Sequence, residues 1–468
     1  MGLSEDRKVV SREKRTSTIT AYQGNVKTLN DELKVSEVRQ RIRTFSQGNK
    51  DEILEALKLL SKIKDTPVVI HGAVGCSASE LYFSKDNSNS TWYSTDLNEK
   101  DTIMGGDNKL RDTIYRVYRK YKPEVIFVVG TPIVAINNDD VNSVILELEE
   151  ELDVRILSIY TDGFKSKAGI NGIDIVLHTI GRELIQQGRE GEKENFLNLI
   201  SATENQYAVK ELLRLLDSLD VKVNLLPSFG SIDNIRKAHL AKASVAVNDD
   251  EAEVLLEILR EKADVPVIHS KAPIGVIGTM EWLKNIGKQL QLQEKVTAFI
   301  AKEEERIEKY ISKQPLRGKK VYIEAPIYVA VSLAGLIEEL GGEVTGISVD
   351  HVDPFNRVSL KGLPENLPIK VGEGQPFELV NILHKNRPDY YIGTSAHSAL
   401  VGKLGIVPVS LENKILYGYE GVLELIHSFH KAENRKSLVE YLGENTGLSY
   451  KKSWINKNVN WYIKQEVK

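Results

Sequence analysis

The chain contains one cysteine, Cys76, and the residues around it suit the binding of a metal or an inorganic group. Cys76 ends the hexapeptide His71–Cys76, which follows the apolar run Pro67–Ile70. This pattern predicts a short buried strand and a glycine-bracketed turn, the position at which α/β folds present ligands and reactive groups. Gly75 beside the thiol lets a bulky inorganic group approach the backbone. The local pattern is equally compatible with a small apolar side chain packed under a loop.

Two further segments combine acids, hydroxyls and glycine. Ser94–Asp101 includes Asp96, which either hydrogen-bonds the surroundings of a metal cluster or belongs to a helix cap. The turn Gly130-Thr131-Pro132 ends a second apolar run. The residues Asn137–Asp140 that follow it precede a helical pattern, so capping and the helix dipole explain them without a functional role.

Two segments in the later part of the chain carry histidine. His269 follows an apolar run and is either a hydrogen-bonded structural residue or a catalytic one. In the turn Gly393–Ser398, backbone N–H groups at a helix start are suited to holding an anion. The sequence contains neither the P-loop nor the dinucleotide-binding glycine motif, so we expect this chain to bind no nucleotide.

Composition indicates an ordinary globular protein. The 468 residues include 62 basic and 66 acidic residues, for a net charge of −4, which argues against nucleic-acid or membrane-surface binding. No apolar run approaches the ~20 residues of a membrane span. A single cysteine forms no internal disulfide and fits a reducing, cytoplasmic setting. One cysteine also cannot build a four-thiolate metal site within one chain.

Short apolar strands alternate with amphipathic helices along the chain, which predicts an α/β fold with parallel sheets. A helix pattern leads into a β-branched strand three times, at 148–159, 212–226 and 333–347. We therefore expect three doubly wound, Rossmann-like domains with an extension at each end. The expected boundaries are an N-terminal extension 1–50, domains 51–200, 201–310 and 311–435, and a tail 436–468. We expect the extension to lie over a partner or another part of the fold, and the tail to be frayed or packed on a partner.

Taken together, these segments resemble the component 1 subunits of nitrogenase, in the correct order over about residues 45–430. The resemblance to β-type chains, meaning the β subunit and its cofactor-assembly scaffold counterpart, comes from the later motifs. The matching segments are His71–Cys76, Ser94–Asp96, Gly105–Asn108, Asn138–Asp140, Thr161–Phe164, a glycine-bearing loop Gly169–Gly172, Pro273–Val276, Thr279, Glu281–Leu283, Ile392–Ser395, Leu404–Val409 and Gly418–Gly421.

The resemblance implies an iron–sulfur cluster at an interface between two chains, with Cys76 as one ligand. Two other cysteines of the family pattern are missing: none precedes Asp51, and Thr131 stands in the turn that should carry another. This chain therefore offers one thiolate, which favours a [4Fe–4S] cluster held mostly by a partner over an eight-iron cluster. The expected cofactor-binding residues are Cys76, Gly75, Asp96 and Thr131, with Cys76 as the metal ligand.

Three functions follow from the resemblance. The first is a β-type subunit of a nitrogenase-like oxidoreductase, relaying electrons through the interface cluster in a heterotetramer. Its implied partners are an α-type subunit and a separate ATP-dependent iron–sulfur reductase. The second is a scaffold subunit for metal-cofactor assembly, and the third is a structural subunit that has lost its cluster. A homodimer supplies only two thiolates, so it would need another ligand such as Asp96. The substrate is not readable from the sequence.

Overall fold

The computed structural model describes residues 18–34, 41–42, 51–76, 91–161, 168–186, 192–372, 376–447, 450–457 and 464–465. These residues form two compact units, each described separately below. The first unit contains residues 50–204 and 221–269, and the second contains residues 17–49, 205–220 and 270–468. Three sheets of parallel strands lie within these units, which confirms the α/β fold with three parallel-sheet domains. The expected domain boundaries stay a prediction.

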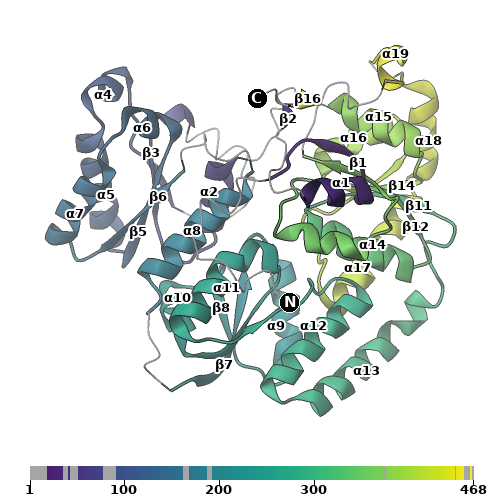
Figure 1. The fold of residues 1–468 in the computed structure, drawn as a ribbon, viewed down its shortest axis with the longest axis horizontal. Helices are drawn as coiled ribbons and strands as arrows, with labels where there is room; N and C mark the ends of the chain where they lie inside the picture. Colours follow the sequence, from purple (N-terminus) through teal and green to yellow (C-terminus); the bar gives the residue numbers. More distant parts are fainter. Residues whose placement is uncertain are drawn as a thin grey trace. The chain divides into compact units, whose positions relative to one another are not determined.

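The first unit holds two four-stranded parallel sheets (Figure 1). The strand order is β4-β3-β5-β6 in the first sheet and β10-β9-β7-β8 in the second. In the first sheet, α2 and α8 cover one face, and α5 and α7 cover the other. The strands are β3 (Val68–His71), β4 (Trp92–Ser94), β5 (Val125–Gly130), β6 (Arg155–Tyr160), β7 (Glu194–Ser201), β8 (Val223–Pro227), β9 (Ala241–Ala246) and β10 (Val267–Ile268). The helices are α2 (Glu52–Leu60), α4 (Glu99–Met104), α5 (Asp107–Tyr121), α6 (Pro132–Asn137), α7 (Val141–Glu151), α8 (Ile170–Glu183), α10 (Ile232–Lys237), η1 (Ala238–Leu240) and α11 (Asp249–Ala263).

The second unit is built around a six-stranded sheet of order β1-β13-β12-β11-β14-β15. Its strands are parallel except β1, which pairs antiparallel with β13. Figure 1 shows α15 and α16 on one face of this sheet, with α14 and α17 on the other. The strands are β1 (Tyr22–Asn25), β11 (Lys320–Glu324), β12 (Glu343–Val349), β13 (Pro368–Val371), β14 (Tyr390–Gly393) and β15 (Val407–Ser410), with β2 (Arg41–Ile42) and β16 (Lys464–Gln465) paired separately. The helices are α1 (Val26–Leu33), α9 (Gln206–Asp217), α12 (Gly275–Leu290), α13 (Gln293–Ile311), α14 (Ile327–Glu339), η2 (Asn356–Gly362), α15 (Pro376–Asn386), η3 (Ser395–His397), α16 (Ser398–Gly402), α17 (Gly418–Glu433), α18 (Lys436–Asn445) and α19 (Lys452–Ile455).

A repeated sequence pattern starts one strand in each unit. Helix α5 ends before Pro123 and leads into β5, and α15 ends before Pro388 and leads into β14. Proline lacks an N–H and cannot continue a helix. The residue before each proline, Lys122 or Arg387, adopts the left-handed conformation, with φ of 46° and 43°. The same short pattern therefore produces the same turn in both units.

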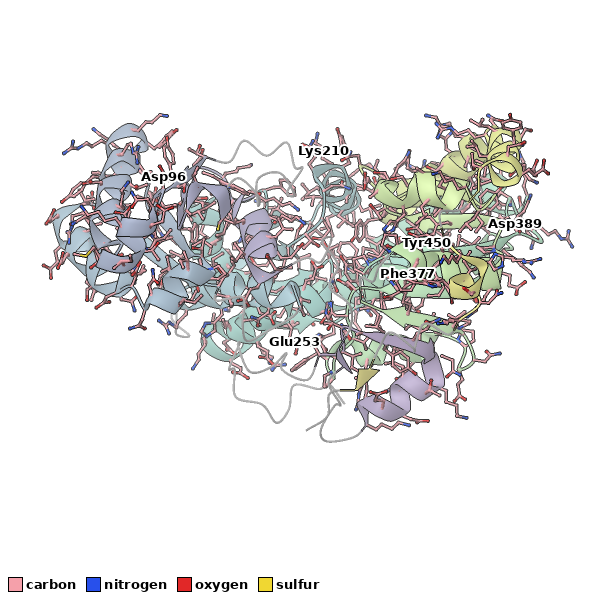
Figure 2. The ribbon with its side chains drawn as sticks, turned by 90° about the horizontal axis from the view of Figure 1, so that it is seen from above. Asp96, Lys210, Glu253, Phe377, Asp389 and Tyr450 are labelled. Carbon is pink, nitrogen blue, oxygen red and sulfur yellow. The ribbon has the colours of Figure 1, made fainter. Side chains whose placement is uncertain are left out.

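The two expectations about the N-terminal extension and the C-terminal tail have different outcomes. Residues 18–34 add β1 and α1 to the six-stranded sheet, so this part of the extension lies over another part of the fold, as expected. The expectation of a frayed tail is wrong for residues 450–457, and packing of the tail on a partner stays a prediction. Phe377 on α15 makes edge-to-face ring contacts with Tyr450 (Figure 2) and Trp454, and Asn381 donates a hydrogen bond to the Lys457 carbonyl at 2.7 Å. None of the described helices combines the length and apolarity needed to cross a membrane.

The glycine-bearing segment Gly169–Gly172 was expected to be a loop, and this is wrong. Helix α8 begins at Ile170, and Gly172 lies inside it, where α8 crosses α2. A Cβ atom on Gly172 would lie 1.9 Å from the Glu52 carbonyl oxygen. The glycine therefore permits a close helix crossing and does not form a turn. Asp162–Phe164, also part of the resemblance, lie outside the described residues.

Candidate functional site

Cys76 lies just beyond the carboxyl end of β3, where the strand order of the first sheet reverses. Chain order runs β3, β4, β5, β6, whereas spatial order runs β4, β3, β5, β6, so the reversal lies between β3 and β5. In open α/β sheets ligands bind outside the carboxyl ends of the strands at this reversal. Residues 74–76 are helical, and the Cys76 thiol is exposed. The exposed thiol argues against the alternative of a small apolar side chain packed under a loop.

A buried polar network holds the start of the Cys76 turn. The His71 side chain is fully buried, and its Nδ1 lies 3.0 Å from the Thr95 hydroxyl. That hydroxyl oxygen also accepts the Gly72 N–H at 3.0 Å. The Nε2 of His71 lies 3.5 Å from the Asp139 carboxylate. Burial lowers the pKa of His71 to about 4, so its imidazole is neutral at physiological pH.

Asp139 faces His71 in this network, a contact that no sequence motif predicts. Its pKa is raised, first by burial and then by the nearby charge of Asp107, while the backbone N–H of Gly106 opposes the shift. A Cβ on Gly106 would lie 2.8 Å from the His71 ring and 2.9 Å from the Asp139 carboxylate, so only glycine fits between them. Capping and the helix dipole were the expected roles of Asn137–Asp140, and the cap of α7 is Asp140, whose carboxylate accepts the Ser143 N–H at 3.1 Å. The adjacent acids in Asn137–Asp140 gave no signal that separates these two roles.

The Thr131 side chain links the turn after β5 to the turn after β3. Its hydroxyl donates to the His71 carbonyl at 2.8 Å, and its side chain is buried. A Cβ on Gly72 would lie 2.3 Å from the Thr131 hydroxyl oxygen, so the two turns are in direct contact. Thr131 therefore has a structural role here, and its role in cofactor binding stays a prediction.

The other two expected site residues are exposed near the same edge of the sheet. Asp96 comes shortly after β4 and itself adopts the left-handed conformation, with φ of 54° (Figure 2). The cap that the pattern allowed is formed by Asn98, which accepts the Asp101 N–H at 3.1 Å. Gly75 is exposed, and a Cβ at this position would meet no described atom within 4 Å. Their roles as cofactor-binding residues also stay predictions.

The two histidine segments have partners within the chain. His269 Nδ1 lies 3.0 Å from the Asp249 carboxylate, which raises the pKa of His269 despite partial burial. In the turn Gly393–Ser398, the Ser395 N–H donates to the Glu412 carboxylate at 3.1 Å. The helix start thus holds an anion, as the pattern suggested, and the anion is a side chain of the same chain.

A cluster ligated by this chain alone does not fit the residues present. Among the described residues, no group of three or more His, Cys, Asp or Glu side chains is arranged to hold a metal ion. The chain has one thiolate to offer, and a cubane cluster takes about four. An exposed thiol at a sheet edge does fit one ligand of a cluster shared with a second chain.

A family model decides the relationship. The model for nitrogenase component 1 type oxidoreductases matches residues 54–432. The chain belongs to this family. The match spans all three parallel sheets except β1, and it confirms the family resemblance drawn from the ordered motifs.

Individual members of the nitrogenase component 1 family share about a quarter of their residues with this chain. The iron–molybdenum cofactor biosynthesis protein NifE of Clostridium pasteurianum is 27% identical over 369 residues, covering 74% of this chain and 78% of that protein. The nitrogenase molybdenum–iron protein alpha chain of Methanothermobacter marburgensis is 26% identical over 401 residues, covering 79% and 84%. The solved structure titled nitrogenase Cp1 at pH 5 has a TM-score of 0.72 at 18% identity and covers 96% of this chain and 97% of its own, so the fold is shared. These relatives do not distinguish a β-type chain from the other types, so that assignment stays a prediction.

Proposed function

We propose that this chain is one subunit of a nitrogenase-component-1-type complex, and that Cys76 donates one thiolate to a [4Fe–4S] cluster shared with a partner chain. The exposed thiol at the strand-order reversal of the first sheet carries this proposal. In this role the chain is a β-type subunit that works in the cytoplasm with an α-type partner and an ATP-dependent iron–sulfur reductase. The bound cluster supplies one-electron transfer.

The residues of this chain position the thiolate. Thr131 and Thr95 hold the backbone of the turn after β3 from two sides, through the His71 carbonyl and the Gly72 N–H. The His71 imidazole beside Asp139 is neutral at physiological pH, so it adds no positive charge to the base of the turn. A rigid support of this kind fixes the direction of a metal ligand, and buried hydrogen bonds around a site tune its potential.

The alternative function, assembly of a metal cofactor, is favoured by the names of the relatives. NifE proteins of several organisms, each described as a cofactor biosynthesis protein, align with about four-fifths of this chain. A scaffold would use the same exposed thiolate and the same fold. Transfer of a cofactor from the complex to a second protein would support the scaffold, whereas sustained substrate reduction would support the oxidoreductase.

Alkylation of Cys76 tests whether the thiol becomes a metal ligand in the complex. In the isolated chain the exposed thiol is expected to react with iodoacetamide, as followed by mass spectrometry of the intact protein. In the complex purified without oxygen, we expect the reaction to be slower by about tenfold or more, because a coordinated thiolate is a poorer nucleophile.

An iron chelator separates coordination from simple coverage by the partner. Removing iron from the intact complex is expected to restore the reactivity of Cys76. Equal reaction rates in the isolated chain and the complex would refute the ligand assignment. Protection that survives removal of iron would also refute it, and would indicate that Cys76 is only packed at the interface.

A further inference from the structure

The strand order also reverses in the six-stranded sheet. A group of titratable side chains lies at this reversal and is not part of the Cys76 site. The order β13-β12-β11-β14-β15 reverses between β11 and β14. Glu324 is the last residue of β11, Tyr391 lies on β14, and His397 ends η3, which follows β14. This is the edge at which open α/β sheets bind ligands.

The three side chains contact one another. His397 Nδ1 lies 3.1 Å from a carboxylate oxygen of Glu324 and 3.3 Å from the Tyr391 hydroxyl. Glu324 is also near enough to the Tyr391 hydroxyl to contribute to the raised pKa of this phenol. A Cβ on Gly393 would lie 2.4 Å from the Tyr391 hydroxyl oxygen. Glycine at this position therefore leaves room for the Tyr391 ring to extend along the strand towards its carboxyl end. The position of Tyr391 therefore depends on the glycine that ends its own strand.

The protonation states of the group follow from its surroundings. Tyr391 is fully buried, and burial together with Glu324 raises its pKa well above the usual range, so the hydroxyl remains a donor. Burial alone would raise the pKa of Glu324, but His397, Lys370 and Tyr391 together hold it below the usual range, so Glu324 is a carboxylate. A carboxylate accepts hydrogen bonds only, so His397 Nδ1 must carry a hydrogen. Nε2 is then the atom of His397 that gains or loses a proton.

The group is reached from outside the protein, unlike His71 in the first sheet. The side chains of His397 and Glu324 are 33% and 20% exposed. The loop that carries His397 is fixed by Glu412, whose carboxylate accepts from the Thr394 hydroxyl at 2.9 Å and from the Ser395 N–H. A histidine that is oriented, partly exposed and paired with a carboxylate has the usual arrangement of a general acid or base.

We propose that Glu324, Tyr391 and His397 form a proton-transfer site, in which His397 Nε2 donates a proton to a small molecule bound outside the carboxyl ends of β11 and β14. The Nε2–H bond breaks, its electron pair stays on the imidazole, and the proton forms a bond with a lone pair of the bound molecule. Glu324 holds the Nδ1–H throughout, and solvent returns a proton to Nε2. The inference rests on the proposed reductase function, because reduction of most small molecules consumes protons together with electrons.

Histidine NMR on the full chain tests the site without any activity. The His397 resonance, identified by its loss in His397→Gln, is expected to titrate in the pH range in which the chain stays folded. Glu324→Gln is expected to lower the pKa of His397 by about one unit or more, because the neighbouring negative charge is removed. The charged or titratable groups that face the pair are Lys370 on β13, Tyr322 on β11, Tyr391 on β14 and Glu412 after β15. Of these, Tyr322 and Tyr391 have pKa values raised by burial and do not titrate in this range. No titration of His397, or the same pKa in Glu324→Gln, would overturn the proposal.

Reduction of hydrazine to ammonia by the iron-loaded complex, driven by a chemical reductant, tests the function of the site, because each hydrazine takes up two protons on its nitrogen atoms together with two electrons. His397→Gln is expected to lower this rate about 100-fold with unchanged iron content, whereas His430→Gln, an exposed histidine on α17, retains it. Equal rates in His397→Gln and the unsubstituted complex would overturn the proposal. A complex without iron or turnover would instead refute the proposed function, and the NMR titration then decides the site alone.

Discussion

The Gly172→Ala variant is expected to lose about 3 kcal/mol or more of its free energy of unfolding, because the added methyl group has no room. Its Cβ would lie 1.9 Å from the Glu52 carbonyl oxygen and 3.0 Å from the Ala56 backbone nitrogen. Both atoms belong to the backbone of α2, so no side-chain rotation relieves the contact. Helices α2 and α8 must separate, and the core between them loses packing.

Gly335→Ala is the matched control for this effect. Gly335 lies on α14, is exposed, and would place its Cβ within 4 Å of no described atom. Alanine is the better helix former, so Gly335→Ala is expected to gain about 0.5 to 1 kcal/mol. Chemical denaturation of both variants measures the difference. A Gly172→Ala variant as stable as the unsubstituted chain would show that α2 and α8 do not cross as closely as described.

The Glu251→Gln variant is expected to be more stable than the unsubstituted chain at pH 8 and nearly equal to it at pH 4.5. Glu251 is buried on α11, where one of its carboxyl oxygens accepts a hydrogen bond from the Thr203 hydroxyl at 2.6 Å. Burial, together with the neighbouring carboxyl of Glu204, raises the pKa of Glu251 to about 8. The pKa of Glu204 is raised as well, chiefly by burial.

The sign of the pH dependence follows from the raised pKa. Between about pH 4.5 and 8 the unfolded chain ionises at this position while the folded chain keeps the proton. The stability associated with Glu251 is thus complete below about pH 4.5, falls by about 1.4 kcal/mol per pH unit, and is lost once the pH exceeds the folded pKa. Glutamine has no such proton, so we expect the variant to be more stable by about 3 kcal/mol or more at pH 8.

Unfolding free energies measured from pH 4.5 to 9 check this expectation. Glu261→Gln, an exposed position near the end of the same helix, is expected to stay within about 0.5 kcal/mol of the unsubstituted chain throughout. Parallel curves for Glu251→Gln and the unsubstituted chain would contradict a buried proton at Glu251.

Most of the fold was predictable because the signals were local. Pro67–Ile70 indicated a buried strand, and the prolines at 123 and 388 marked where helices end and strands begin. The helix across Gly172 was missed because glycine usually marks a turn, and only a helix crossing explains it here. The tail at 450–457 was missed because its packing on α15 depends on contacts with Phe377, distant in sequence.

The sites were less predictable because they are assembled by topology. Cys76 was identifiable from its hexapeptide, which places both the strand end and the thiol. Asp139 and Glu324 were not, since each looks like an ordinary cap or strand-end acid until its partner is known. The partner of Asp139 is 68 residues away in the sequence, and that of Glu324 is 73 residues away. The ends of neighbouring parallel strands bring such residues together, and the strand order is not encoded in any single motif.

The content of iron and acid-labile sulfide per subunit pair tests the central claim most directly. It is measured on the complex of this chain with its α-type partner, purified without oxygen. We expect about four iron atoms and four sulfides per pair, lost in Cys76→Ala. Val74→Ala, an exposed position on the same turn, is expected to keep them. A complex that holds no iron, or that keeps all its iron in Cys76→Ala, would contradict the assignment of Cys76 as a cluster ligand.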